Sequence, residues 1–221
     1  MKRKFLFLTM LLTLCAVGTM KAQNSITTVT TETELIAAVQ TNNAQIQFAN
    51  DISTSSLLEI KNSRTITIDM NGFTLDRGCT SRGSQVIVVR TGSTLNLSNG
   101  TLTGGWGGNG GALDIETGTT VNLTDVIVTG NYADDRGGGI SNSGTLTMTD
   151  CVLSNNISRD NVENKGGGGL FNYANCTATL TNVTISDNLA YRYGGGIRNE
   201  GTLTIIECAV SIATSALARH F

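Results

Sequence analysis

Proline is absent from the 221 residues, and His220 is the only histidine. The lack of proline and the low share of charged residues, 14%, argue against a disordered tail or a proline-rich linker. A single histidine excludes most catalysis and metal ligation that use imidazole. The net charge is only −2. Without a basic excess to neutralise phosphates, the sequence argues against a nucleic-acid partner.

The first 22 residues resemble a targeting segment. Lys2, Arg3 and Lys4 precede an apolar stretch from Phe5 to Met20, which is short for a membrane span. This pattern is typical of a signal peptide cleaved after Ala22, so we expect an exported protein, secreted or held at the cell surface or outer membrane. The mature chain would then have no transmembrane segment. A retained membrane anchor and lipidation at Cys15 are the alternatives.

A short helix is predicted next, within an N-terminal segment that spans residues 23–44. Thr31 and Glu34 form a capping box, and apolar residues follow at helical spacing, which indicates a helix over about residues 32–42. From residue 45 onward the apolar residues alternate instead. This period of two is typical of strands.

Internal repeats determine the predicted fold. Residues 121–131, 146–156 and 178–188 superpose without a gap, and a Gly-Gly-apolar motif recurs at Gly110, Gly138, Gly168 and Gly195. A unit of 25–32 residues made of short strands cannot bury its own apolar face, whereas stacked units can. The sequence therefore predicts an all-β parallel β-helix over residues 45–208.

Two rows of amide or carboxylate side chains recur in these repeats. One row aligns Asn131, Asn156 and Asn188, and the other aligns Asp114, Asn142, Asn172 and Asn199. Asparagine tolerates the left-handed conformation, and stacked amides can bond from coil to coil. We interpret both rows as structural ladders.

Short motifs resemble those of a known family. Residues 110–113 read Gly-Gly-Ala-Leu, and residues 128–131, 153–156 and 185–188 read aliphatic-x-x-Asn. These motifs resemble the Gly-Gly-Ala-Ile and Phe-x-x-Asn tetrapeptides of polymorphic outer-membrane proteins, within the pectin-lyase-like superfamily. The resemblance implies a right-handed parallel β-helix. It implies no single function, because that fold hosts lyases, hydrolases and adhesins.

Aromatic and charged residues gather at one turn of successive coils. They are Trp106, Tyr132, Asp134, Asp135, Arg159, Tyr191, Arg192 and Tyr193. Aromatic rings can stack on sugars, and charges can hold carboxylates or hydroxyls, so we predict a ligand-binding edge. The simpler alternative is that exposed turns collect such residues without a ligand.

Catalytic candidates are few. Asp134, Asp135 and Arg136 are adjacent, whereas the enzymes that the sequence resembles arrange several acids and bases over neighbouring strands. Asp114 and Glu116 form a weaker pair on one strand. We expect no catalytic centre, no metal and no cofactor, with calcium at a carboxylate as the alternative.

The repeat pattern stops after residue 208. Residues 209–221 form an atypical tail, which we interpret as a truncation or a helical cap, and an uncapped end would favour end-to-end self-association. The predicted function is a non-enzymatic adhesin-like or glycan-binding domain whose partners are glycans or host and cell-surface macromolecules. The alternatives are a lyase or hydrolase of acidic polysaccharide, and a scaffold fragment of a larger surface protein.

Overall fold

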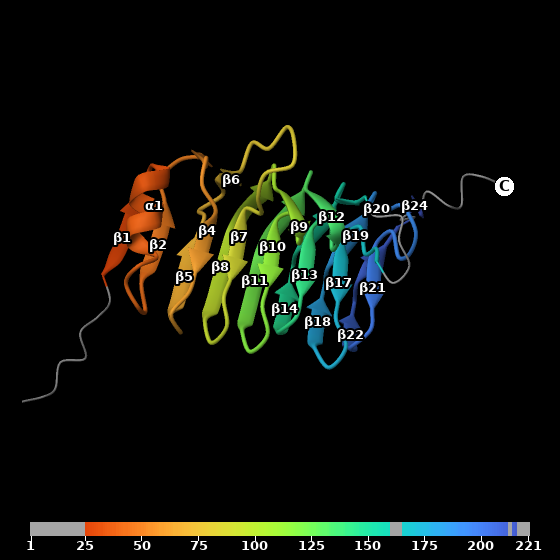
Figure 1. Cartoon of the computed structure of the whole chain (residues 1–221). Helices are drawn as coiled ribbons and strands as arrows, with labels where there is room; N and C mark the ends of the chain where they lie inside the picture. The colour runs from red at the N-terminus through yellow and green to blue at the C-terminus, as the bar shows by residue number, and fades with distance from the viewer. Residues whose placement is uncertain (1–24, 160–164, 212–213, 216–221) are drawn as a thin grey trace, which may run out of the picture.

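The computed structural model describes residues 25–159, 165–211 and 214–215 (Figure 1). The predicted signal peptide and part of the predicted tail lie outside these ranges. Within them, short strands form three parallel sheets, and the chain passes from sheet to sheet as it advances along one axis. The result is a parallel β-helix of about six turns, which confirms the predicted fold class.

The strands of the described residues divide among three sheets. The main path of sheet A contains β1 (Ile26–Val29), β2 (Gln45–Phe48), β5 (Thr65–Asp69), β8 (Thr94–Thr103), β11 (Thr120–Thr129), β14 (Thr145–Thr149), β18 (Thr177–Thr181) and β22 (Thr202–Ile206). Beside this path, sheet A includes β3 (Ile52–Ser53), β6 (Thr74–Asp76), β15 (Val152–Ser154), β19 (Thr184–Ser186) and β23 (Ala209–Val210). Sheet B contains β4 (Leu58–Ile60), β7 (Ile87–Val89), β10 (Leu113–Ile115), β13 (Ile140–Asn142), β17 (Leu170–Asn172) and β21 (Ile197–Asn199). Sheet C contains β9 (Trp106–Asn109), β12 (Tyr132–Arg136), β16 (Ile157–Ser158), β20 (Leu189–Ala190) and β24 (Thr214–Ser215).

Helix α1 (Glu32–Ala38) covers the first coil (Figure 1). The predicted capping box is present, because the Thr31 side chain accepts from the Glu34 amide and the Glu34 carboxylate accepts from the Thr31 amide. The helix ends earlier than predicted, with Val39 as its C-cap. Strand β1 precedes the helix and pairs with β2, although the sequence pattern predicted no strand there.

The interior consists of apolar columns that rise through the coils. Val121 pairs with Leu146, and Leu123 pairs with Met148, which in turn pairs with Leu180. All five side chains are buried. Each buried aliphatic side chain of this size contributes about 1.5–3 kcal/mol, so stacking supplies the stability that one coil lacks.

Glycines turn the corner between sheets C and B. Gly110, Gly137, Gly167 and Gly194 all have positive φ. A Cβ on Gly137 would lie 2.0 Å from the carbonyl oxygen of Ile140. The corner therefore requires glycine both for its backbone conformation and for its close packing.

The placement of Asp114 in an asparagine row was wrong. Asp114 pairs with Ser141, and it is Ile115 that pairs with Asn142. The sequence alignment matched Gly110 and Gly111 to Gly138 and Gly139. In the structure Leu113 pairs with Ile140, so Gly110 corresponds to Gly137, one residue earlier. Asp114 consequently points to the outer face of sheet B, between the buried side chains of Leu113 and Ile115.

The remaining asparagines form two hydrogen-bonded columns. In the first column, Asn131 Nδ2 donates to Asn156 Oδ1, and Asn156 Nδ2 donates to Asn188 Oδ1. Both distances are 3.0 Å. In the second, Asn142 donates to Asn172 and Asn172 donates to Asn199, both at 2.7 Å. The members of the first column are completely buried. These bonds satisfy polar groups that would otherwise be stranded inside the solenoid.

The two ends of the described solenoid differ. At the N-terminal end Leu35 of α1 is buried against the core. At the other end Ile205 is 47% exposed and Val210 is 61% exposed, although their partners one coil below, Leu180 and Ile185, are buried. Strands β23 and β24 continue the sheets beyond residue 208.

Candidate ligand-binding surface

The outer face of sheet C positions the predicted aromatic residues. Trp106 of β9 pairs with Tyr132 of β12, and Tyr132 pairs with Ile157 of β16. Ala133, the next residue along β12, is completely buried. Because side chains alternate along a strand, Trp106 and Tyr132 project from the opposite, outer face.

Arginine covers these two rings. The centroids of Trp106 and Tyr132 are 5.4 Å apart, and the guanidinium carbon of Arg159 lies 4.3 Å from the first and 4.7 Å from the second. This distance is typical of a cation–π contact. We call Trp106, Tyr132, Arg159, Asp134 and Arg82 the arginine–aromatic surface.

Asp134 holds the edge of this surface. The indole Nε1 of Trp106 donates to Asp134 Oδ1 at 2.9 Å, and Nε of Arg82 lies 2.7 Å from Asp134 Oδ2. Arg82 lies on the segment between β6 and β7, which projects beyond the stacked coils (Figure 1). Arg82 could not be predicted from the repeat pattern, because this segment belongs to no repeat.

The three catalytic candidates have different partners. Asp134 engages Trp106 and Arg82, as described above. Asp135 lies 2.7 Å from Nζ of Lys165, and Arg136 lies over the rings of Phe171 and Tyr173 at 5.3 and 5.4 Å. Both carboxylates are thus paired with cations, an arrangement that does not resemble an acid and a base poised around one substrate bond.

The later part of the predicted edge is separate. Tyr191 and Tyr193 are exposed, at 39% and 44%, and Arg192 is half-buried. Tyr193 lies under Arg198, whose guanidinium carbon is 5.0 Å from the ring centroid. Of the predicted ligand-binding residues, the structure therefore brings Trp106, Tyr132, Asp134 and Arg159 together.

A second group of rings, which sequence analysis missed, lies on the outer face of sheet B. Phe171 and Tyr173 have ring centroids 4.6 Å apart, and Arg136 and Arg198 both lie over Phe171. Phe171 is completely buried but does not belong to the interior core. The arginine side chains therefore act as its cover.

Several cations contact these two groups of rings or the carboxylates beside them. They are Arg82, Arg136, Arg159, Lys165 and Arg198. Among the described carboxylates, Asp134, Asp135 and Glu200 are each in an ion pair with one of these cations. Arg159 is exposed and takes part in none of the ion pairs between described residues.

The described ranges contain no group of three or more His, Cys, Asp or Glu side chains that could hold a metal ion. They also contain no helix that is long and apolar enough to cross a membrane. The four described cysteines, Cys79, Cys151, Cys176 and Cys208, are free thiols.

Comparison with known families agrees with this architecture. The model of a pectate lyase-like adhesive domain matches residues 26–138, which is 113 of 221 residues. The chain belongs to the pectate lyase-like adhesive domain family. It is an adhesin-like β-helix domain, and the matched part includes Trp106, Tyr132 and Asp134. No curated protein and no solved structure matches the chain.

Proposed function

We propose that this adhesive domain is exported to the cell surface and binds acidic glycans through the arginine–aromatic surface. The single observation that carries the proposal is Arg159, whose exposed guanidinium lies over Trp106 and Tyr132 without a described carboxylate partner. A guanidinium held flat by two rings keeps its outward N–H groups available for an anion. Carboxylate and sulfate groups fit this fork in a bidentate manner.

The rings support a saccharide rather than a simple ion as the ligand. Sugar rings have apolar faces that pack on Trp and Tyr, and Trp106 is kept in place by its hydrogen bond to Asp134. The exposed Arg159 would attract the acidic groups of a polyanionic chain. A glycan with regularly spaced acidic groups satisfies both features.

The rival proposal is that the domain cleaves acidic polysaccharide, with Asp134 or Asp135 as the catalytic carboxylate. Their ion pairs with Arg82 and Lys165 support binding more than proton transfer. One assay separates the two proposals. The purified chain is incubated with acidic and neutral polysaccharides, with calcium and without, and is read for new reducing ends and unsaturated products.

Binding is measured on the same polysaccharides by pull-down and calorimetry. We expect retention on acidic polysaccharide without cleavage, and a loss of affinity of about tenfold or more in Arg159→Ala and in Trp106→Ala. Arg64→Ala is the matched control, because Arg64 bonds to Gln40 at the other end of the solenoid.

Two outcomes would contradict the proposal. Equal retention of wild type and Arg159→Ala would remove the arginine–aromatic surface from the interaction. Cleavage that is abolished by Asp134→Asn or Asp135→Asn would replace the adhesin with an enzyme.

Two finer relationships are proposals as well. The Gly-Gly-Ala-Leu motif at residues 110–113 supports kinship with polymorphic outer-membrane protein repeats. The exposure of Ile205 and Val210 supports self-association through the C-terminal coil.

A further inference from the structure

A polar groove lies on the outer face of sheet B, over β10 and β13. Its volume is about 300 Å³, and its lining includes Thr91, Asp114, Glu116, Ser141, Ser143 and Tyr173. This volume is at the lower limit of known small-molecule pockets, which suits one sugar ring rather than a chain. We call it the Asp114 groove.

Asp114 lies in the groove as a half-buried carboxylate. Burial is the main cause that raises its pKa to about 6, and the neighbouring charge of Glu116 raises it further, while a hydrogen bond from Ser141 and the charge of Arg90 lower it. None of the ion pairs between described residues involves Asp114. The carboxylate therefore retains acceptor capacity that the protein does not use.

The repeat itself does not require a carboxylate at this position. The residues paired with Asp114 on the neighbouring coils are Val88 and Ser141, and Phe171 follows on the next coil. These side chains form no ladder of like residues, in contrast to the asparagine columns. Asp114 is thus a local feature of the groove and not part of the solenoid's internal bonding.

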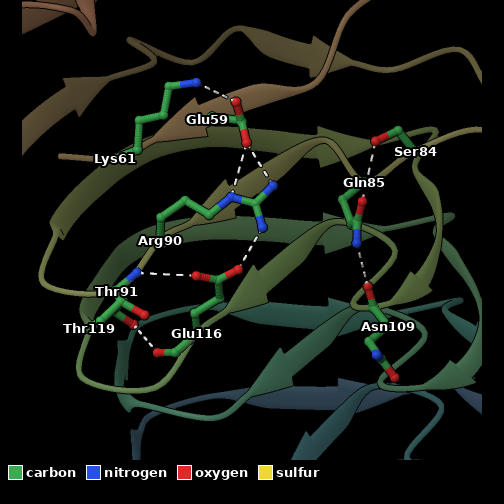
Figure 2. A network of polar contacts seen from close by, with 9 residues as sticks. All are labelled: Glu59, Lys61, Ser84, Gln85, Arg90, Thr91, Asn109, Glu116 and Thr119. Carbon is green, nitrogen blue, oxygen red and sulfur yellow. Dashed lines mark hydrogen bonds and ion pairs between the residues drawn. The ribbon is translucent and has the colours of Figure 1, made fainter.

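Glu116 forms a wall that is fixed in place. Figure 2 shows Arg90 between two glutamates, with its Nη1 donating to Glu116 at 2.5 Å and its Nε donating to Glu59 at 2.9 Å. The amide of Thr91 donates to the other carboxylate oxygen of Glu116 at 3.2 Å. Because Arg90 and the Thr91 amide hold the Glu116 carboxylate in place, a ligand would not need to order this side chain on binding.

Tyr173 adds an aromatic wall. Nη1 of Arg136 donates to the Tyr173 hydroxyl at 3.4 Å and its guanidinium lies over the ring, while Phe171 packs against the ring's side. A ring fixed in this way can contact the apolar face of a sugar. Arg90 and Arg136 each contact a residue of the groove's lining, Glu116 and Tyr173 respectively, and both are already engaged there.

We propose that the Asp114 groove binds a single neutral sugar ring, with adjacent sugar hydroxyls donating to the Asp114 carboxylate and the ring face contacting Tyr173. Charge-assisted hydrogen bonds of this kind are about twice as strong as neutral ones. The carboxylates of Asp114 and Glu116 repel acidic sugars. The groove therefore has the opposite charge preference to the arginine–aromatic surface and is a separate site.

The test uses NMR titration of the full chain with methyl glycosides of neutral hexoses, each compared with the corresponding uronic acid. We expect millimolar or tighter binding of at least one neutral glycoside at pH 7.5 and at least tenfold weaker binding of its uronic acid. At pH 5 Asp114 is about nine-tenths protonated, so affinity should fall by up to about tenfold. Asp114→Asn should bind at least tenfold more weakly at pH 7.5 and lose the pH dependence.

Asp150→Asn is the matched control, since Asp150 lies on sheet A's corner and bonds to Asn182. Trp106→Ala should retain the neutral-sugar binding, which distinguishes failure of this proposal from failure of the proposed function. The groove proposal is overturned if no neutral glycoside binds at concentrations up to about 50 mM. It is also overturned if Asp114→Asn binds as wild type does, or if the uronic acid binds equally well.

Discussion

The first asparagine column and the arginine–aromatic surface both rise through successive coils, yet they differ in almost every physical respect. Asn131, Asn156 and Asn188 occupy equivalent positions, are completely buried and bond to one another. Trp106 and Tyr132 are stacked differently, since Arg159 covers both from the next coil. The comparison teaches that identical residues repeated in the interior stabilise the solenoid, whereas the unlike, half-buried or exposed residues of the outer surface are the ones we propose to contact a ligand.

The largest loss of stability is expected when Asn156 is removed from the buried asparagine column. Its Oδ1 accepts from the Asn131 amide and side chain, and its Nδ2 donates to Val128 O and Asn188. Asn156→Ala leaves several of these groups buried without a partner, so we expect about 3 kcal/mol lower stability in urea denaturation. Asn122→Ala, which removes a half-buried bond to Asn96, should cost less than about 1 kcal/mol. Similar losses in both variants would mean that burial does not determine how much an asparagine hydrogen bond contributes to stability.

A smaller change of the opposite sign, a gain in stability, is expected when Asp114 is replaced by asparagine. Because its folded-state pKa of about 6 exceeds the ordinary 3.8, the native state binds the proton more tightly than the unfolded state. Stability therefore falls as pH rises from about 4 to 6, and the full penalty is present at pH 7.5. Asp114→Asn should be about 1–2 kcal/mol more stable than wild type at pH 7.5.

The same pair of proteins, unfolded in urea at about pH 2.5, gives the control. At this pH, well below the ordinary pKa of 3.8, Asp114 is protonated in both states, so the stability difference should disappear. A constant difference at both pH values would mean that the carboxylate's ionisation is not its cause.

The smallest change in stability is expected for Arg159, on the arginine–aromatic surface. Arg159→Ala removes a guanidinium that bonds to no described carboxylate, so the free energy of unfolding should change by less than about 1 kcal/mol. Urea denaturation of this variant beside Asn156→Ala measures the contrast directly. A loss as large as that of Asn156→Ala would assign Arg159 to the scaffold.

The repeated part of the fold could be predicted from sequence because equal spacing fixes equal register. Leu123 and Met148 pair as the alignment of their segments indicated, and the Thr31 capping box is local enough to be recognised. Asp114 was misplaced because one additional glycine at the corner shifts a short motif without changing its appearance. A register error of one residue moves a side chain from the interior to the surface.

The candidate sites were harder to predict, because their partners come from outside the repeat. Arg82 reaches Asp134 from an irregular segment, and Lys165 reaches Asp135 across 30 residues. Phe171 has the sequence character of a core residue but lies on the outer face beneath arginines. The spacing of the repeats predicts which residues occupy equivalent positions on successive coils. It does not predict contacts with residues outside the repeat or on the outer face.

The unequal ends of the solenoid have a mechanical consequence for an adhesive domain. The described strands progress from the coil beside α1 to the opposite end of the stack (Figure 1), where Ile205 and Val210 are exposed. Tension along the axis would load the described coils in series, and the coil of β22 and β23 buries less of its apolar side chains than the coils before it. Under force we expect the described coils to detach one at a time, starting at this coil and proceeding toward α1, and each hydrogen bond between buried asparagines should resist the detachment of its coil.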